Sequence, residues 1–537
     1  MGFLVLDEDY ESQAQAKIQA SLSHSPDGVQ QHGGNLNLNL RYEITLPLLT
    51  NPRENRLKCH ETAQETAYVS AHISSRIHAL YSQLELAAAN SPTLAAPDDE
   101  GIALSIEIAP QSFDIYPDCD HRRYHSRRLH LHSPETLPLL PFIRKLYIKS
   151  TDSYKGVCGL YGIRPLSLLV PLQCIAALPK LTTLLLPYGW ERPMTYPSPS
   201  TPVREHYTRP WEGPLRDARH DFGNAICEQE KFLGAGKRIP TSLKNALLHF
   251  WEPQQIALED QTVARPDLIH PAEKDPFSVG LCRLAVQLEK LDLRAIVTED
   301  LFPATGAAEN QQQWSSMQRL RIEFHPLRPD GMWYFVGPRG EDPLRSDSSG
   351  GGGSEDDREG GFHISDTADY PREHDIPADK EIDEEFDEFP NGDSELDELL
   401  DMFRTEPHRE KVEPLLARFA AAVASMPRLK DAEMFAYVWW TPSESREEEY
   451  AGDAPYDKNS VHKWSVRYLA AGREDGGDDR DGKTTTPVVQ WQVGDWRPST
   501  GVMELFEALG TQEWLAFEFT EGRPLATTND AMRARQF

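Results

Sequence analysis

The sequence predicts an α/β protein with a curved, mainly parallel β-sheet covered on its outer side by helices. Three observations support this prediction. An apolar spacing recurs along the chain, stretches with helical spacing separate its copies, and two helix-to-strand joints share a proline. With 537 residues and 39% apolar content, the chain can build a large core or an elongated array.

The predicted strands follow the spacing Φ-x-x-Φ-x-Φ, where Φ is apolar. It occurs in IRKLYI, LTTLLL, LEKLDL and MQRLRI, and more weakly in SLKNALL. The last two apolar positions of each unit, such as Leu146 and Ile148, lie two residues apart. They therefore point to the same face of a short strand.

The predicted helices are the apolar-periodic stretches before these strands. They are LSLLVPLQCIAAL, FSVGLCRLAVQ, VEPLLARFAAAVASM (before RLKDAEMFAYV) and GVMELFEAL (before EWLAFEF). In ALPKL and SMPRL a proline ends the helix, because the residue before proline avoids the helical region. A helix followed by a leucine-patterned strand, repeated, is the unit of a leucine-rich-repeat solenoid.

The repeat is irregular. Leu146 and Leu184 lie 38 residues apart, whereas Leu291 and Leu320 lie 29 apart. We therefore expect an irregular leucine-rich-repeat-like solenoid, a distorted horseshoe. The alternative is an ordinary α/β domain in which the leucine spacing arose by chance.

Composition divides the chain into four regions. Residues 1–36 are expected to be disordered or weakly ordered, and 37–339 form the first part of the repeat region. Residues 340–410 form an acidic, Gly/Ser-rich insert, and 411–537 form the C-terminal part with a strand hairpin. The insert contains SDSSGGGGSEDDREGG, and 11 of the 21 residues from Glu381 to Asp401 are acidic with none basic. Such a composition predicts disorder.

The end of the insert has a different pattern. SELDELLDMF predicts a short helix at 394–404, with Ser394 as a possible N-cap. Its candidate interaction residues, at helical spacing, are Leu396, Leu399, Leu400 and Phe403. The helix could dock on a partner, but packing against the chain's own fold is the preferred interpretation.

Charge and cysteine content limit which partners and which cellular compartment are expected for the protein. Lys and Arg total 55 against 85 Asp and Glu, a formal charge of −30, which argues against nucleic acid or anionic membrane as a general partner. The six cysteines form no C-x-x-C pair, so neither a disulfide scaffold nor a zinc knuckle is expected. The start MGFLVLDEDYES resembles no signal peptide. We expect a cytoplasmic or nuclear protein.

One stretch matches a phosphate-binding loop. GDDRDGKT, Gly477 to Thr484, fits G-x-x-x-x-G-K-[ST], but that motif needs a strand before it and a helix after it. Here WSVRYLAA precedes the stretch and VVQWQVGDW follows, and both alternate like strands. The stretch therefore predicts the tip of a hairpin.

Two further patterns suggest metal ions weakly. DEFPNGDSELDE resembles a calcium loop from Asp387 to Glu398, but Phe389 occupies a ligand position. CDHRRYHSRRLHLH gathers potential zinc ligands, but arginines interrupt them. These ligands are Cys119, His121, His125, His130 and His132. We interpret the stretch as a basic loop and edge strand that could contact the acidic insert through its arginines, Arg122, Arg123, Arg127 and Arg128.

Several long stretches resemble a family of filamentous-fungal proteins usually described as F-box or leucine-rich-repeat-like. They include DPFSVGLCRLAVQLEKLDLRAIVTEDLFP, MQRLRIEFHPLRPDGMWYFVGPRGED and REKVEPLLARFAAAVASMPRLKDAEMFAYVWW, with LPFIRKLYIKS upstream. The family carries no established activity. Its members often begin with an F-box, a helical module that docks a ubiquitin-ligase adaptor. No such pattern occurs at the start of this sequence.

These observations favour a non-enzymatic protein-interaction scaffold. A ubiquitin-ligase adaptor is expected as a partner only if an F-box is restored upstream. The alternatives are a ubiquitin-ligase substrate receptor whose F-box is missing from this sequence and an enzyme of unrecognised class. We assign no catalytic, cofactor-binding or metal-ligating residue, since no G-x-S-x-G, H-E-x-x-H or dinucleotide motif occurs. Most tryptophans after residue 438 are expected to pack within the sheet.

The hairpin interpretation of GDDRDGKT is testable. Lys483→Ala should leave the midpoint of urea unfolding unchanged, because an exposed loop lysine contributes little to stability. Tight ATP binding by the wild type that this variant abolishes, measured by calorimetry, would contradict it.

Overall fold

The computed structural model describes much of the chain, and the account below concerns these residues. They are 3–6, 39–49, 61–90, 101–109, 111, 126–150, 164–187, 191, 201–251, 261–262, 264–303, 313–340, 361–372, 381, 401–450, 460–472, 486–517 and 519–520.

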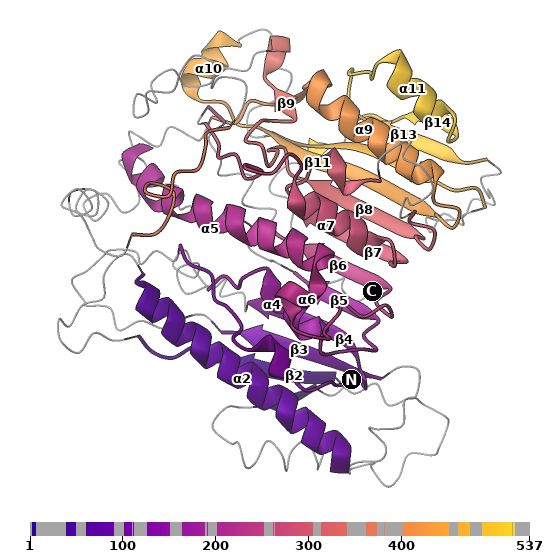
Figure 1. Ribbon diagram of the computed structural model, residues 1–537. Helices are drawn as coiled ribbons and strands as arrows, with labels where there is room; N and C mark the ends of the chain where they lie inside the picture. Colours follow the sequence, from indigo (N-terminus) through magenta and orange to yellow (C-terminus); the bar gives the residue numbers. More distant parts are fainter. Residues whose placement is uncertain are drawn as a thin grey trace.

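One large sheet of 13 strands organises the fold (Figure 1). Its strands are β1 (Phe3–Leu6), β2 (Asn39–Ile44), β3 (Ile102–Ile108), β4 (Ile143–Ser150), β5 (Thr183–Leu186), β6 (Asn245–His249), β7 (Lys290–Ala295), β8 (Arg319–Phe324), β11 (Asp431–Trp440), β12 (Ser460–Leu469), β13 (Val488–Gln492), β14 (Thr511–Trp514) and β15 (Phe519–Thr520). A separate antiparallel pair joins β9 (Phe335–Val336) and β10 (Glu406–Pro407).

The helices connect and flank these strands. They are α2 (Ala63–Asn90), α4 (Leu169–Ile175), α5 (Thr201–Cys227), α6 (Gln229–Leu233), α7 (Pro276–Ala285), α9 (Arg409–Ala424), α10 (Glu444–Glu449) and α11 (Thr500–Glu507). Short 3₁₀ turns occur at η1 (Pro134–Thr136), η3 (Glu299–Leu301) and η4 (Pro338–Gly340).

From β1 to β14 the strands lie in the sheet in the order in which they occur in the chain, while β15 pairs with β12. From β1 to β8, and on to β11, every neighbouring pair is parallel. Strand β12 then runs antiparallel between β11 and β13, and β14 is parallel to β13. The prediction of a mainly parallel α/β sheet is confirmed.

The recurring apolar spacing marks these strands and their register. Leu146 on β4 lies opposite Leu184 on β5, followed by Ala246, Leu291 and Leu320 on the next three strands. All five side chains are buried in one continuous core. The second apolar position of each predicted unit therefore forms a single row across the sheet.

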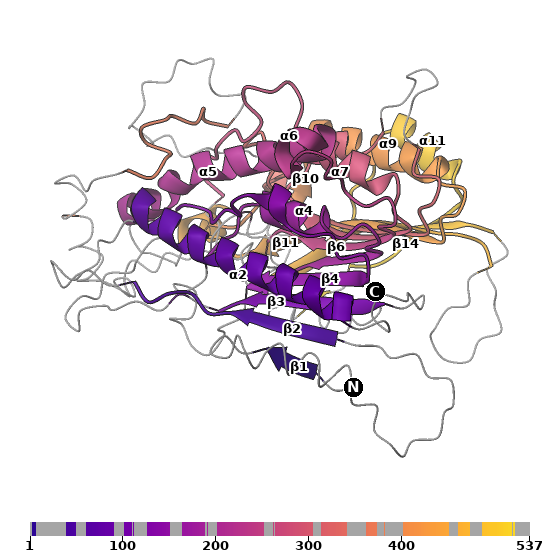
Figure 2. The same ribbon diagram turned by 60° about the horizontal axis from the view of Figure 1, so that its bottom comes forward.

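The predicted helices α4, α7, α9 and α11, together with α5 and α6, pack on one side of that row. Figure 2 shows α4, α5, α6, α7, α9 and α11 together above the sheet. Their apolar side chains, such as Leu172, Leu281 and Phe419, belong to the same core as the strand residues. Helix α7 begins at residues that favour a helix start. The Asp275 carboxylate accepts hydrogen bonds from the N–H groups of Phe277 and Ser278, as an N-cap residue does. Pro276 occupies the first helical position, where proline is favoured.

Helix α5 was not predicted from the sequence, because Pro210 and Pro214 interrupt its pattern. A proline removes a helical hydrogen bond and crowds the preceding turn. Here the N–H of Gly213 donates instead to the carbonyl of Asp369, at 2.8 Å. A segment from elsewhere in the chain thus replaces a missing intrahelical partner.

That segment, residues 361–372, runs along α5 and is called the strap below. Asp369 is fully buried and pairs with Arg209 at 2.9 Å, and the Tyr370 hydroxyl donates to Asp217 at 2.6 Å. A side chain at Gly213 would collide with the Tyr370 ring. The prediction that most of 340–410 is disordered is therefore wrong for the strap, which belongs to the folded body.

Two other predicted segments also differ from the structure. Phe3–Leu6, inside the segment expected to be disordered or weakly ordered, forms β1 and pairs with β2. Residues 401–404, the described part of the helix expected at 394–404, are not helical: Met402 forms a β-bridge with Thr441. The Asp401 carboxylate accepts from the N–H of Ser443 at 3.0 Å and pairs with Arg446. These tertiary contacts override the local helical pattern.

The predicted hairpin near the C-terminus is confirmed. Strands β12 and β13 are antiparallel, and Leu469 pairs with Val488 at the ends that flank GDDRDGKT, which itself lies outside the described residues. Since a strand follows the stretch, the context of a phosphate-binding loop is missing. Trp440, Trp464 and Trp491 are almost fully buried, as the packing interpretation expects.

Replacing Phe403 tests whether it is an interior residue. It is fully buried against Trp440 and Tyr450, and the Arg446 guanidinium lies 3.9 Å from its ring centre. Phe403→Ala should lower the free energy of unfolding by about 3–5 kcal/mol through a cavity, and Phe403→Leu by clearly less. Urea denaturation of both variants measures this. An unchanged midpoint in Phe403→Ala would show that the side chain is free to meet a partner.

Candidate interaction surface on the sheet

Alternation along the strands gives the sheet a second face, directed away from the core residues just described. Side chains on this face alternate with the core positions, as successive strand residues must. Leu247 and Phe435 show that it is distinct: both are buried, yet neither belongs to the core formed with the helices. Apart from such residues, the face is rich in charge.

Basic side chains gather where six neighbouring parallel strands begin. Lys145, Thr183, Asn245, Lys290, Arg319 and Asp431 form one row of paired positions across β4–β8 and β11. The preceding row, Arg144, Thr182, Lys244, Glu289, Gln318 and Lys430, is joined by backbone hydrogen bonds of 2.7–2.9 Å. We call the basic members of both rows the basic rim. Lys145, Lys290 and Arg319 lie at second-face positions, while Arg144, Lys244 and Lys430 belong to the alternate row and lie at the edge of the sheet where the strands begin.

The two acidic residues in these rows are already engaged. Asp431 is held by two hydrogen bonds of 3.0 Å from Arg467, and Glu289 accepts from the Gln318 amide at 3.2 Å. In contrast, Lys145, Arg319 and Lys430 are exposed. The rim is therefore a locally positive surface on a chain whose formal charge is −30.

Further along the second face of the sheet, a network of ion pairs crosses β6, β7, β8, β11 and β12. Asp292 lies at its centre, 3.1 Å from His249 and 3.4 Å from Arg321. Arg321 continues to Glu433 at 3.5 Å, and Glu433 also pairs with Lys463. Cross-strand pairs of opposite charge on adjacent strands stabilise the sheet, so this network ties the parallel strands to the antiparallel ones.

Electrostatics favour the ionised form of Asp292. Burial by itself raises the pKa of this carboxyl, but the hydrogen bond from His249 and the electrostatic effects of His249, Arg321 and Arg294 outweigh it. The net pKa lies well below the usual range for aspartate. The Asp292 side chain is only 5% exposed, so loss of its charge would leave neighbouring cations uncompensated.

A second group of buried charges lies beyond the opposite ends of the strands. Arg219 on α5 pairs with Glu191 and with Asp275, and it donates to the carbonyl of Ile296 at 2.9 Å. Burial raises the pKa of Glu191 to about 7, against the opposing effect of Arg219. All three charged side chains are fully buried, and Asp275 caps α7. This group joins α5, α7 and the loops after β5 and β7.

The structure does not bring the predicted site residues together. Phe403 is interior, while Leu396, Leu399 and Leu400 lie outside the described residues, as does the possible calcium loop. Of the arginines expected to face the acidic insert, Arg128 is buried and donates to the carbonyls of Leu166 and Glu191, at 3.1 Å each. Arg128 is therefore an interior residue and does not belong to an exposed basic loop.

The other residues of the histidine- and arginine-rich stretch CDHRRYHSRRLHLH do not form the expected basic loop and edge strand where the structure describes them. Arg127 donates to the carbonyl of Pro371 on the strap at 3.2 Å. His130 and His132 are exposed, and Leu129 forms an isolated bridge with Leu166 rather than an edge strand of the sheet. Arg122, Arg123, Cys119, His121 and His125 lie outside the described residues.

The basic rim was missed although its signal is in the recurring units themselves. IRKLYI, LEKLDL and MQRLRI each carry a Lys or Arg just before the second apolar position, and SLKNALL carries Lys244 two residues before it. Only the parallel register places these cations side by side, because it aligns the units across neighbouring strands.

Comparison of the chain with protein-family models, with curated proteins and with solved structures gives no match. Within the described residues, no helix is both long enough and apolar enough to cross a membrane.

Asp292→Asn tests the ion-pair network. The depressed pKa means that ionised Asp292 stabilises the fold above its unfolded value of about 3.9, and that this contribution fades as pH falls below it. The variant should lose about 3 kcal/mol at pH 7, as expected when a buried pair loses one partner. The deficit should shrink towards pH 3.

Urea unfolding at pH 7, 4 and 3 measures both effects. Asp495→Asn, at an exposed position, is the matched control and should match the wild type throughout. A deficit in Asp292→Asn that is equally large at all three pH values would assign it to packing instead of charge.

Proposed function

We propose that the protein is a non-enzymatic protein-interaction scaffold whose basic rim binds an extended acidic segment of a partner protein. One observation carries this proposal: six basic side chains line the starts of neighbouring parallel strands while the chain as a whole is strongly acidic. A basic surface on such a chain would attract acidic ligands selectively.

The dimensions of the rim suit a short peptide. Neighbouring strands are about 4.8 Å apart, so the rim spans about 24 Å from β4 to β11, the length of about seven extended residues. Lys145, Arg319 and Lys430 would contact carboxylates directly because they are exposed. The ion pair between Asp431 and Arg467 compensates the carboxylate of Asp431, which lies in the same row as Lys145 and Arg319.

We also propose that the fold is an irregular leucine-rich-repeat-like solenoid. The strand order supports this kinship, since each βα unit adds a strand next to the previous one. Doubly wound sheets instead reverse direction at a switch point. The resemblance to F-box-type proteins would then concern their substrate-recognition region. A complete ligase receptor would need an F-box, and binding of a purified ubiquitin-ligase adaptor by this chain would favour that role.

We place the protein in the cytoplasm or nucleus. Cys174, Cys227 and Cys282 carry free thiols, as is typical of a reducing compartment.

Charge reversal at the rim tests the proposed binding. A fluorescent peptide of alternating Glu and Ser should bind the chain with an affinity that falls as salt rises, because exposed charges are screened. The triple variant Lys145→Glu, Arg319→Glu, Lys430→Glu should weaken binding at least about tenfold, or 1.4 kcal/mol, in fluorescence anisotropy.

Lys231→Glu is the matched control, because Lys231 is 69% exposed on α6, within the helix layer. It should bind like the wild type. An equal loss of peptide affinity in the control would mean that the peptide is attracted non-specifically. Unchanged peptide binding by the triple variant would show that the rim is not the binding site. Stronger binding of duplex DNA than of the peptide by the wild type would favour a nucleic-acid partner instead.

A further inference from the structure

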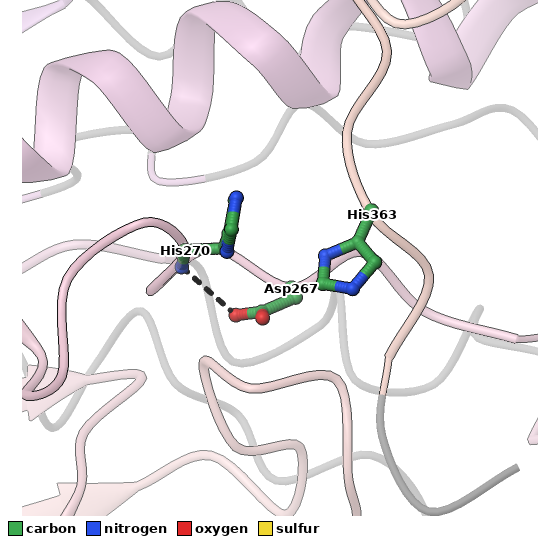
Figure 3. A group of neighbouring side chains, drawn as sticks. All are labelled: Asp267, His270 and His363. Atoms are coloured by element: carbon green, nitrogen blue, oxygen red, sulfur yellow. Dashed lines mark hydrogen bonds between the residues drawn. The ribbon is translucent and has the colours of Figure 1, made fainter. Parts of the chain in front are cut away.

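A group of potential metal ligands lies where the strap meets the connection between β6 and α7. Asp267 and His270 come from that connection, and His363 comes from the strap (Figure 3). The two segments are nearly a hundred residues apart in the sequence, and no spacing motif links them. The fold alone brings them together.

The ligand atoms are close enough to share one ion. One nitrogen from each histidine and one carboxylate oxygen all lie within 4.8 Å of one another. The two imidazole rings have centroids 4.8 Å apart and are inclined by 63°. Ligands at about 2.1 Å from a tetrahedral zinc ion lie about 3.4 Å from each other, so small rotations of the exposed histidines would close the site.

Backbone hydrogen bonds hold the Asp267 carboxylate in place. Its Oδ1 accepts hydrogen bonds from the N–H groups of Ile269, at 2.9 Å, and His270, at 3.2 Å. Among the described residues no donor contacts Oδ2. A carboxylate fixed through one oxygen can offer the other to a metal, and such second contacts orient ligands in metal sites.

Both backbone segments are fixed as well. Asp267 N–H donates to the carbonyl of Phe362 at 2.9 Å, and Phe362 N–H donates to that of Arg265 at 2.8 Å. On the other side, Gly361 packs against Gly331 so closely that a side chain on either glycine would collide with the other. His363 is therefore positioned by the two residues before it, whose main chains contact two different segments of the body.

We propose that Asp267, His270 and His363 bind a divalent transition-metal ion, with zinc the preferred occupant. Imidazole nitrogens with one carboxylate suit zinc and its neighbours and do not suit magnesium or calcium, which prefer all-oxygen sites. Three protein ligands leave a position for water or for a partner's side chain. The bound ion would fasten the start of the strap to the connection between β6 and α7.

Zinc titration of the full chain, first freed of metal with a chelator, tests this site. Isothermal calorimetry should show one saturable Zn²⁺ site, and Co²⁺ should give the visible absorption bands of a bound ion. His363→Ala and His270→Ala should each weaken Zn²⁺ binding at least about tenfold. In hydrogen exchange, Zn²⁺ should protect the strap amides near residues 361–364 in the wild type and not in His363→Ala.

His132→Ala is the matched control, since His132 is an exposed histidine outside this group. It should retain wild-type affinity and strap protection, and circular dichroism should show all three variants folded. A wild type with no saturable Zn²⁺ site would overturn the proposal. So would a site abolished by His132→Ala and retained in His363→Ala, which would place the metal on the histidine-rich stretch around residues 119–132.

Discussion

The alternation of side chains along the parallel strands is the constraint on which the rest of this structure depends. One set of positions, Leu146, Leu184, Ala246, Leu291 and Leu320, must meet the helices, because these apolar side chains form a single row in the core. Parallel neighbours require crossover connections, and right-handed crossovers place successive helices on the same side. The alternate positions are thereby committed to the second face, where charged residues are tolerated and can be used.

Charge then performs two different tasks in the same sheet. Within its centre, ion pairs such as Asp292 with His249 and Arg321 are largely buried and compensated, so they connect strands of different direction. At the strand starts, exposed cations such as Lys145 and Arg319 remain available to a ligand. Beyond the other ends of the strands, Arg219 unites α5, α7 and two loops. The strap adds a further cross-link along α5, where its Asp369 carbonyl replaces a helical partner lost near two prolines.

The sequence predicted what depends on local pattern. The apolar spacing located β4 to β8, and helical periodicity located α4, α7, α9 and α11, because both record which side chains are buried. Features set by long-range contacts were missed. Helix α5 contains prolines whose cost is met by the strap, and Phe403 carries a helical pattern yet is extended against Trp440. The basic rim and the Asp267–His270–His363 group also required the fold, since each combines residues from separate units of the chain.

The most direct test of the central claim, that the basic rim at the strand starts forms the binding surface, is lysine footprinting with and without the acidic peptide. Acetylation measured by mass spectrometry should fall at Lys145, Lys290 and Lys430 when the peptide is bound, and stay constant at Lys231 and Lys274, whose side chains are exposed near the helices. Protection of Lys231 and Lys274, with Lys145 and Lys430 still reactive, would place binding on the helix side and contradict the account.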